Sequence, residues 1–192
     1  MRAPPGRSAP GNLGRALSPE GPGAELLRSW ERLRSLPGGK RLFSLFIGRR
    51  APYTGSIRAV VQKLEPGRTV VTLVDRHSVR NHLRSVHAIA LTNLGELSSG
   101  LAMLTVLPSG TRGIVVALEV EFHKKARGLL TAEGQAVAPA IDNLPDGDVE
   151  SLATAVIRDA ERDLVAEVRV RWRIGAVDSS GADPVPGLVA SG

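Results

Sequence analysis

The sequence predicts an α+β fold, in which an antiparallel sheet of about six strands wraps around one long central helix, with a helical extension at the N-terminus. Two patterns predict this fold. Several short segments alternate apolar and polar residues, which is typical of strands with one buried face. A single long segment with helical spacing lies between the second strand and the third. Short reversing connections favour antiparallel pairing, and a lone helix must bury itself against the concave face of such a sheet.

The alternation sets the positions of the strands, which we expect at 57–64, 69–74, 116–122, 129–138, 150–160 and 164–176. The alternation itself begins at Tyr53. Glu65-Pro66-Gly67-Arg68 is a turn sequence, so the first two strands should form a hairpin. The buried faces of the third and last strands should carry Val116, Leu118, Val120 and Phe122, and Val168, Val170, Trp172 and Ile174, respectively.

The N-terminal region divides into two parts. Residues 1–23 hold five prolines and five glycines, a composition that predicts a disordered arm. Residues 24–50 form a helical lead-in, with one helix over 24–36 and a shorter one over 39–48. We expect this lead-in to pack over the sheet or to form a lid. The main domain spans 51–176, with a loop at 139–149, and residues 177–192 form a flexible tail.

Composition limits the possible functions. The absence of cysteine excludes disulfides, thiolate metal sites and cysteine nucleophiles. The apolar run Leu42–Ile47 is far shorter than the roughly 20 residues that span a bilayer. Residues 1–23 lack the continuous apolar stretch of a secretory signal. We therefore expect a cytoplasmic protein that has no membrane partner.

The excess of positive over negative charge lies in the leading segment. Residues 1–50 carry ten Lys/Arg and three Asp/Glu, a net charge of +7, whereas residues 51–192 carry fifteen and sixteen, a net charge of −1. The predicted domain is thus close to neutral, and the six Phe, Trp and Tyr residues offer no platform for stacking bases. The distribution argues against nucleic acid as a partner.

The central helix, predicted from about His87 to Leu107, has two unlike sides. An apolar seam is formed by Ala90, Leu94, Leu97, Leu101 and Leu104, and a flank of small residues by Gly95, Ser98, Ser99 and Gly100. Two interior glycines cost about 1 kcal/mol each relative to alanine, which close contact with neighbouring backbone would offset. Glu96 lies on the small-residue flank. Partial desolvation there would raise its pKa and suit it to proton transfer, although a salt bridge or a subunit contact is the alternative use.

Three motifs carry a resemblance to a known family: Asn81-His82-Leu83-x-Ser85-Val86-His87, Gly95-Glu96-Leu97-x-x-Gly100 and Phe122-x-Lys124-Lys125-Ala126-Arg127-Gly128. With the order of elements, they resemble the hotdog-fold acyl-CoA thioesterases over about residues 51–176. The closer similarity is to a poorly characterised, thioesterase-like branch of the DUF4442 type. The motifs are more specific for the hotdog fold than for one substrate.

The resemblance implies a role for each matching residue. Glu96 would act as general base or nucleophile, Asn81 would help to place the carbonyl or the water, and His87 would start the helix so that the N–H of Ala88 serves as oxyanion donor. Substrate binding would involve Gly100 and the basic residues Lys124, Lys125 and Arg127, the latter three meeting CoA phosphates. The family also implies a homodimer or a dimer of dimers, with Glu96 facing a neighbour's Ala88, and no cofactor.

Two departures from the family pattern keep a second function open. The usual His-Gly-Gly turn is His87-Ala88-Ile89 here, and the strand after the helix has the apolar run Ile114-Val115-Val116 where many of these enzymes carry Ser or Thr. Thr111 precedes that run. The chain is therefore interpreted either as a thioesterase acting on acyl-CoA or acyl carrier protein, or as a non-catalytic hotdog module that binds acyl thioesters or a protein.

Other chemistries fit the sequence less well. The histidines (His77, His82, His87 and His123) show no i, i+4 pair, so no metal site is predicted. Ser85, Ser98 and Ser99 lack an accompanying His-Asp arrangement that would make a serine nucleophile. A hotdog dehydratase would require a different spacing of His and acid.

Overall fold

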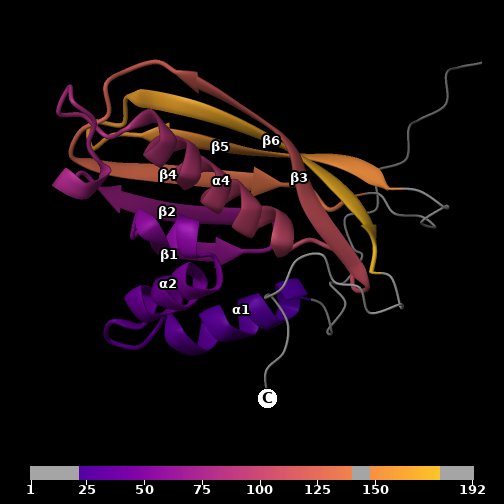
Figure 1. Cartoon of the computed structure of the whole chain (residues 1–192). Coiled ribbons are helices and arrows are strands. Elements are labelled where there is room, and N and C mark those ends of the chain that lie inside the picture. Colours follow the sequence, from indigo (N-terminus) through magenta and orange to yellow (C-terminus); the bar gives the residue numbers. More distant parts are fainter. Residues whose placement is uncertain (1–21, 140–147, 178–192) are drawn as a thin grey trace, which may run out of the picture.

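In the computed structural model, residues 22–139 and 148–177 are described. Within them a six-stranded antiparallel sheet has the order β1-β2-β4-β5-β6-β3. Its strands are β1 (Val60–Glu65), β2 (Arg68–Val74), β3 (Thr111–Phe122), β4 (Leu129–Ala136), β5 (Val149–Arg158) and β6 (Leu164–Ala176). The sheet curves around the long helix α4 (Ala88–Leu104), which lies across one face (Figure 1). The predicted α+β architecture is confirmed.

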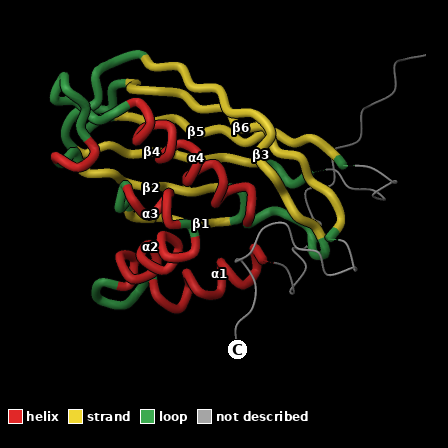
Figure 2. The backbone as a smooth tube through the Cα atoms, viewed as in Figure 1, coloured by secondary structure: helices red, strands yellow, loops and turns green. Residues whose placement is uncertain are grey.

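The N-terminal lead-in consists of α1 (Pro22–Leu33) and α2 (Gly39–Arg50), which lie beside the β1 edge of the sheet (Figure 2). Trp30 and Phe43 join these helices through an edge-to-face ring contact with centroids 5.1 Å apart. Both rings are buried, so this contact belongs to the core. The Ser44 hydroxyl accepts the backbone N–H of Val61 at 2.9 Å and thereby ties α2 to β1. The lead-in is thus packed on the domain.

The first strand begins later than the sequence predicts. Residues Pro52–Ser56 form a short helix, α3, and β1 begins only at Val60. Proline at the start of α3 presets the backbone for a helical turn, which overrides the short apolar alternation that begins at Tyr53. The expectation of strand structure at residues 57–59 is therefore wrong, and the alternation from Tyr53 does not mark a strand. A further short element that the sequence did not predict is the 3-10 turn at His77–Val79.

The third strand also differs from its predicted pattern. The last strand buries Val168, Val170, Trp172 and Ile174 as expected, but β3 leaves Val116 and Phe122 exposed. A bulge between Val115 and Ala117 disturbs the alternation, and β3 is an edge strand with β6 as its neighbour. Leu118 and Val120 still pack against the core. The prediction of a single buried face on this strand is therefore only partly right.

The small-residue flank of α4 faces the sheet. Gly95 lies so close to Val168 of β6 that a Cβ at this position would overlap the valine side chain. Nearby, the Thr69 hydroxyl of β2 donates to the carbonyl of Ser98 at 2.7 Å, and Gly134 of β4 approaches the same carbonyl. The expected compensation for glycine within the helix is therefore found in a different form: Gly95 packs against a side chain, and the close backbone approach occurs at Gly134 of the sheet.

No helix in the described part of the chain is long and apolar enough to cross a membrane. Three sequence predictions lie largely or wholly outside the described residues. These are the disordered arm, whose residues 1–21 are not described, the loop at 139–149, of which 140–147 are not described, and the tail from 178 onward.

Candidate functional site

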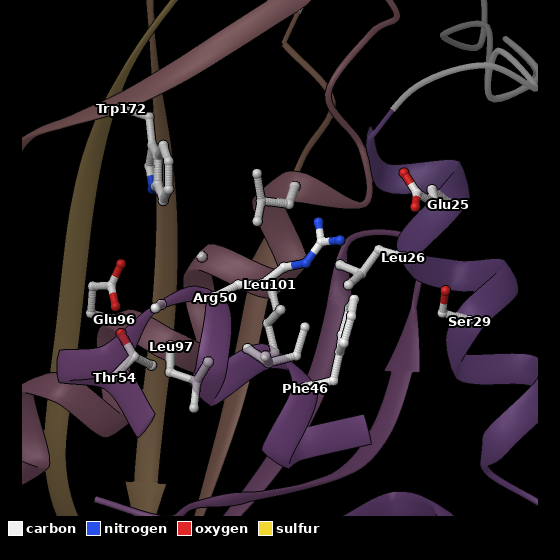
Figure 3. Close-up of a pocket in the computed structure, with 14 residues that line it drawn as sticks. Glu25, Leu26, Ser29, Phe46, Arg50, Thr54, Glu96, Leu97, Leu101 and Trp172 are labelled. Carbon is white, nitrogen blue, oxygen red and sulfur yellow. The ribbon is translucent and has the colours of Figure 1, made fainter. Parts of the chain in front are cut away.

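A cleft of about 200 Å³ opens between α4, the helical lead-in and β6 (Figure 3). Most of its lining is apolar, and its charged side chains are Glu25, Arg50 and Glu96. The lining residues are Glu25, Leu26, Ser29, Phe46, Ile47, Arg50, Ala51, Thr54, Glu96, Leu97, Gly100, Leu101, Leu104 and Trp172. Three residues of the predicted apolar seam, Leu97, Leu101 and Leu104, therefore line a cavity.

Glu96 is the carboxylate on the α4 side of this cleft. Its side chain is only partly exposed, and burial raises its pKa above the ordinary value of 4.5. The cause is desolvation, which disfavours the ionised form. A second carboxylate, Glu25 of α1, lines the same cleft but is exposed. The two acids thus share a cavity in very different environments.

Gly100, one turn after Glu96, keeps a space open between α4 and β6. A Cβ at Gly100 would lie 3.4 Å from Cζ2 of Trp172 and 3.5 Å from Oε1 of Glu96. These two atoms are therefore no more than about 7 Å apart, and both lie next to the unfilled Cβ position. The opposite side of the indole meets Gly113 of β3, where a Cβ would lie 3.1 Å from Cε3. Two glycines thus make room for one tryptophan ring.

Trp172 has an unsatisfied polar atom. Its side chain is buried, with 6% of its surface exposed, and its Nε1 has no hydrogen-bond partner among the described residues. Buried N–H groups are normally paired. Figure 3 shows the indole nitrogen on the side of the ring that faces Glu96. The sequence predicted that Trp172 faces inward, but it gave no sign of a polar role.

Asn81 organises the loop before α4. Its Oδ1 accepts the backbone N–H groups of Leu83 and Ser85, at 2.9 and 3.2 Å, and its Nδ2 donates to the Ser85 hydroxyl at 3.3 Å. The backbone N–H of Asn81 also bonds to the Ser85 carbonyl. These bonds fix the turn that leads into the helix.

His87 caps α4. Its Nδ1 accepts the backbone N–H of Ile89 at 3.1 Å, so the imidazole satisfies one of the free amides of the first turn. The predicted helix start is confirmed, and Ala88 is the first residue of α4. At 1.5 Å per residue, Ala88 lies about 12 Å along the helix axis from Glu96. Glu96 and Gly100 line the cleft described above, whereas Asn81, His87 and Ala88 do not.

The three basic residues after β3 differ in their contacts. Lys124 donates to Asp159 and Asp163, each at 2.6 Å, and these carboxylates raise its pKa. Lys125 and Arg127 are exposed. Between them, the carbonyl of Ala126 accepts the backbone N–H of Val86, which brings the basic run beside the start of α4. The run therefore lies near the group formed by Asn81, His87 and Ala88.

Two other features bear on the chemistry. The Thr111 hydroxyl donates to the carbonyl of Pro108 at 2.7 Å, so it is already engaged within its turn. In addition, Glu121, His123 and Glu167 bring ligand atoms within 4.8 Å of one another at the surface of β3 and β6. The sequence did not predict this group. His123 lies 3.1 Å from a carboxylate oxygen of Glu167 there, so a hydrogen bond between these two side chains accounts for two of the three members of the group.

Comparison with solved structures agrees with this architecture. A structural-genomics target with 28% identity superposes with a TM-score of 0.66, and the match covers 80% of this chain and all of the other. A Pseudomonas aeruginosa protein of unknown function, described as a probable thioesterase, has 24% identity and a TM-score of 0.60, with 74% and 97% covered. A thioesterase from Haemophilus influenzae has 15% identity and a TM-score of 0.56, with 67% and 86% covered.

These similarities confirm the predicted hotdog fold. No curated protein matches the sequence. The model of one family, described as a domain of unknown function (DUF4442), matches residues 39–174, which include α2, α4 and nearly all of the sheet. By this match the chain belongs to the DUF4442 family.

Proposed function

We propose that this protein hydrolyses an acyl thioester, with Glu96 as the general base that activates a water molecule. The observation that carries the proposal is the desolvated Glu96 carboxylate beside an apolar cleft. A carboxylate whose pKa is raised toward neutrality is a better proton acceptor at working pH. The proteins of similar fold that are described as thioesterases support the same class of reaction.

The proposed reaction regenerates the ionised Glu96 carboxylate at the end of each cycle. The oxygen of a water molecule attacks the carbonyl carbon while one of its protons passes to Glu96. The tetrahedral intermediate then collapses, the carbon–sulfur bond breaks, and the departing sulfur takes the proton from Glu96. The products are a carboxylic acid and a thiol, and Glu96 returns to its ionised form. In this scheme Glu96 is a general base first and a general acid second.

The cleft suits the acyl part of such a substrate. Leu26 and Phe46 from the lead-in and Leu101 of α4 are apolar side chains of this cleft (Figure 3), which Leu104 and Glu96 also line. The thiol part is proposed to be CoA or an acyl carrier protein. Lys125 and Arg127 would meet its phosphate, because both are exposed and Lys124 is held by two aspartates.

A second copy of the chain would complete the site. Ala88 and Glu96 lie about 12 Å apart along one rigid helix, so the N–H of Ala88 and the carboxylate of the same chain do not reach one carbonyl group. We therefore propose a homodimer or dimer of dimers in which Glu96 faces the α4 N-terminus of another copy. Asn81 would act there through the loop that it fixes.

The experiment is thiol release from short, medium, long and aromatic acyl-CoA and acyl carrier protein thioesters. Wild type is compared with Glu96→Gln and with Glu25→Gln, a matched control that removes the other carboxylate of the cleft. We expect turnover by wild type, a fall of about a hundredfold or more in Glu96→Gln, and near-normal rates in Glu25→Gln. Equal rates in wild type and Glu96→Gln would exclude Glu96 as the base.

A non-catalytic binding module is the second candidate. It is favoured by the apolar run Ile114-Val115-Val116 and by Thr111, whose hydroxyl is committed to Pro108. The apolar run has no hydroxyl group, and the proton of the Thr111 hydroxyl is already donated to Pro108, so neither would orient an attacking water molecule. A protein that is stabilised against heat by CoA esters but that hydrolyses none of them would support this alternative.

A further inference from the structure

The indole of Trp172 carries a hydrogen-bond donor for which the protein has no acceptor. Its Nε1 is buried, and within residues 22–139 and 148–177 no group accepts its proton. Leaving such a donor unpaired is unfavourable, because the N–H has lost its hydrogen bond to water and gained none in the protein. Asn93 is the other described residue with an unpaired buried side-chain atom, but its amide nitrogen already bonds to the carbonyl of Tyr53. Of these two residues, Trp172 lines the cleft that contains Glu96.

The indole ring and the Glu96 carboxylate approach the same position beside Gly100. Cζ2 is the indole atom closest to the Cβ position of Gly100, and in an indole ring it is separated from Nε1 by a single carbon atom. The carboxylate oxygen of Glu96 lies 3.5 Å from that same Cβ position. The N–H and the carboxylate therefore border one small space, which exists because residue 100 has no side chain.

The ring is held firmly in this position. Val115 of β3 pairs with Trp172 in the ladder, and Gly113 of β3 lies against the six-membered part of the ring. Gly100 of α4 faces its other edge, where an added Cβ would lie 3.4 Å from Cζ2. A donor that is fixed between a helix and a strand needs no reorganisation to bind an acceptor, and such preorganised donors are the most effective in catalysis.

We propose that Trp172 Nε1–H donates a hydrogen bond to the carbonyl oxygen of the bound acyl thioester, next to Glu96. This rests on the proposed hydrolase function and adds a substrate-binding residue to it. As water attacks the carbonyl carbon, negative charge develops on that oxygen, and the N–H bond to it strengthens. When the carbon–sulfur bond breaks, the oxygen becomes part of the product carboxyl group.

The test uses the protein's two tryptophans as reporters. In protein labelled with nitrogen-15 at the indole nitrogens, Trp30 and Trp172 give two N–H signals, which Trp172→Phe assigns. The probe is a ketone analogue of acyl-CoA, in which a methylene group inserted before sulfur keeps the carbonyl and prevents hydrolysis. We expect the Trp172 proton signal to move downfield at saturation while the signal of Trp30 stays in place.

A kinetic arm tests the donor without changing the shape of the site. Benzothienylalanine at position 172 replaces the indole N–H by sulfur and keeps the bicyclic ring, whereas Trp172→Phe also leaves a cavity. We expect both variants to lower kcat/KM about a hundredfold, with thermal stability close to wild type for benzothienylalanine. A normal kcat/KM for benzothienylalanine would overturn the proposal.

The outcomes separate this proposal from the proposed function. Turnover by wild type with an unmoved Trp172 signal would overturn the role of Trp172 and leave the hydrolase function standing. A shifted signal without turnover would support the donor as part of a binding site and contradict the hydrolase. In the benzothienylalanine protein, the acid limb of the pH–rate profile could also move to higher pH. Such a shift would mean that the indole N–H donates to the Glu96 carboxylate instead of the substrate, and it would also overturn the proposal.

Discussion

Gly95 of α4 packs directly on Val168 of β6, with no space for a side chain between them. One turn later, Gly100 faces an opening in which a methyl group would make ordinary contacts with Glu96 and Trp172. The two glycines of one helix thus serve different purposes. Gly95 lets the helix approach the sheet, and Gly100 leaves room in the cleft.

Gly95→Ala should destabilise the fold. The added methyl group would collide with the Val168 side chain at the centre of the helix–sheet contact. Overpacking costs about 1–3 kcal/mol, while alanine regains about 1 kcal/mol of helix propensity. We expect the free energy of unfolding, measured by urea denaturation, to fall by up to about 2 kcal/mol. An unchanged midpoint would show that the helix can move away from β6 at little cost.

Gly100→Ala should keep the fold and lose activity. Its methyl group would stand 3.4 and 3.5 Å from Trp172 and Glu96, which is normal van der Waals contact. Helix propensity would then leave stability unchanged or raise it by up to about 1 kcal/mol. Because the same methyl group fills the space that the proposed substrate carbonyl occupies, we expect kcat/KM to fall at least about tenfold. Full activity in a stable Gly100→Ala protein would contradict this position for the carbonyl.

Glu96 should make stability depend on pH. Burial raises its pKa in the folded state, so above its ordinary value of 4.5 the folded protein binds more protons than the unfolded chain. The free energy of unfolding therefore falls as the pH rises from the ordinary to the raised value. Glu96→Gln cannot ionise and should melt at a higher temperature than wild type at neutral pH.

The raised pKa of Glu96 also predicts how the melting temperatures compare at low pH and where the acid limb of the pH–rate profile lies. Below about pH 4, where the carboxyl is protonated in both states, the difference in melting temperature should disappear. Glu25→Gln should show no such pattern, because Glu25 is exposed. The acid limb of kcat/KM in wild type should lie above the ordinary glutamate range. A limb at or below pH 4.5 would contradict a desolvated base.

Substitutions of the two lysines in the basic run should have different effects: Lys124→Met should change stability, and Lys125→Met should change substrate binding. Lys124→Met breaks ion pairs to Asp159 and Asp163 and should lower the melting temperature. Lys124 depresses the pKa of Asp159, so this loss should shrink as the pH falls through the range where Asp159 takes up a proton. Lys125→Met should leave the melting temperature unchanged and raise KM for CoA esters, more so at low salt. A stable Lys124→Met protein would show that these pairs contribute little.

The sequence predicted the elements of the fold well, because strand alternation and the glycine-rich apolar helix are local patterns. The prediction was wrong where tertiary context or turn-forming residues determine the backbone conformation. Pro52 starts a helix where alternation suggested a strand, and the bulge after Val115 exposes Val116. Pairing in the sheet, which a single strand does not encode, determines such bulges.

The candidate site was only partly predictable. Glu96 and Gly100 stood out because a carboxylate and a glycine interrupt an apolar helix, and the structure brings them to one cleft. No sequence pattern indicated that α1 and α2 would line the cleft, since Leu26 and Phe46 are apolar residues like many others. Trp172 matched the pattern of a buried strand residue, and only the three-dimensional structure reveals that its N–H has no acceptor among the described residues.

If Glu96 is the base of a thioester hydrolase, its removal must slow the reaction itself. The most direct measurement is the ratio of kcat/KM for wild type and Glu96→Gln on the best acyl-CoA substrate, with Glu25→Gln as control. We expect a ratio of about one hundred or more, with the control near unity and all three proteins folded. A ratio near one, at measurable turnover, would contradict it.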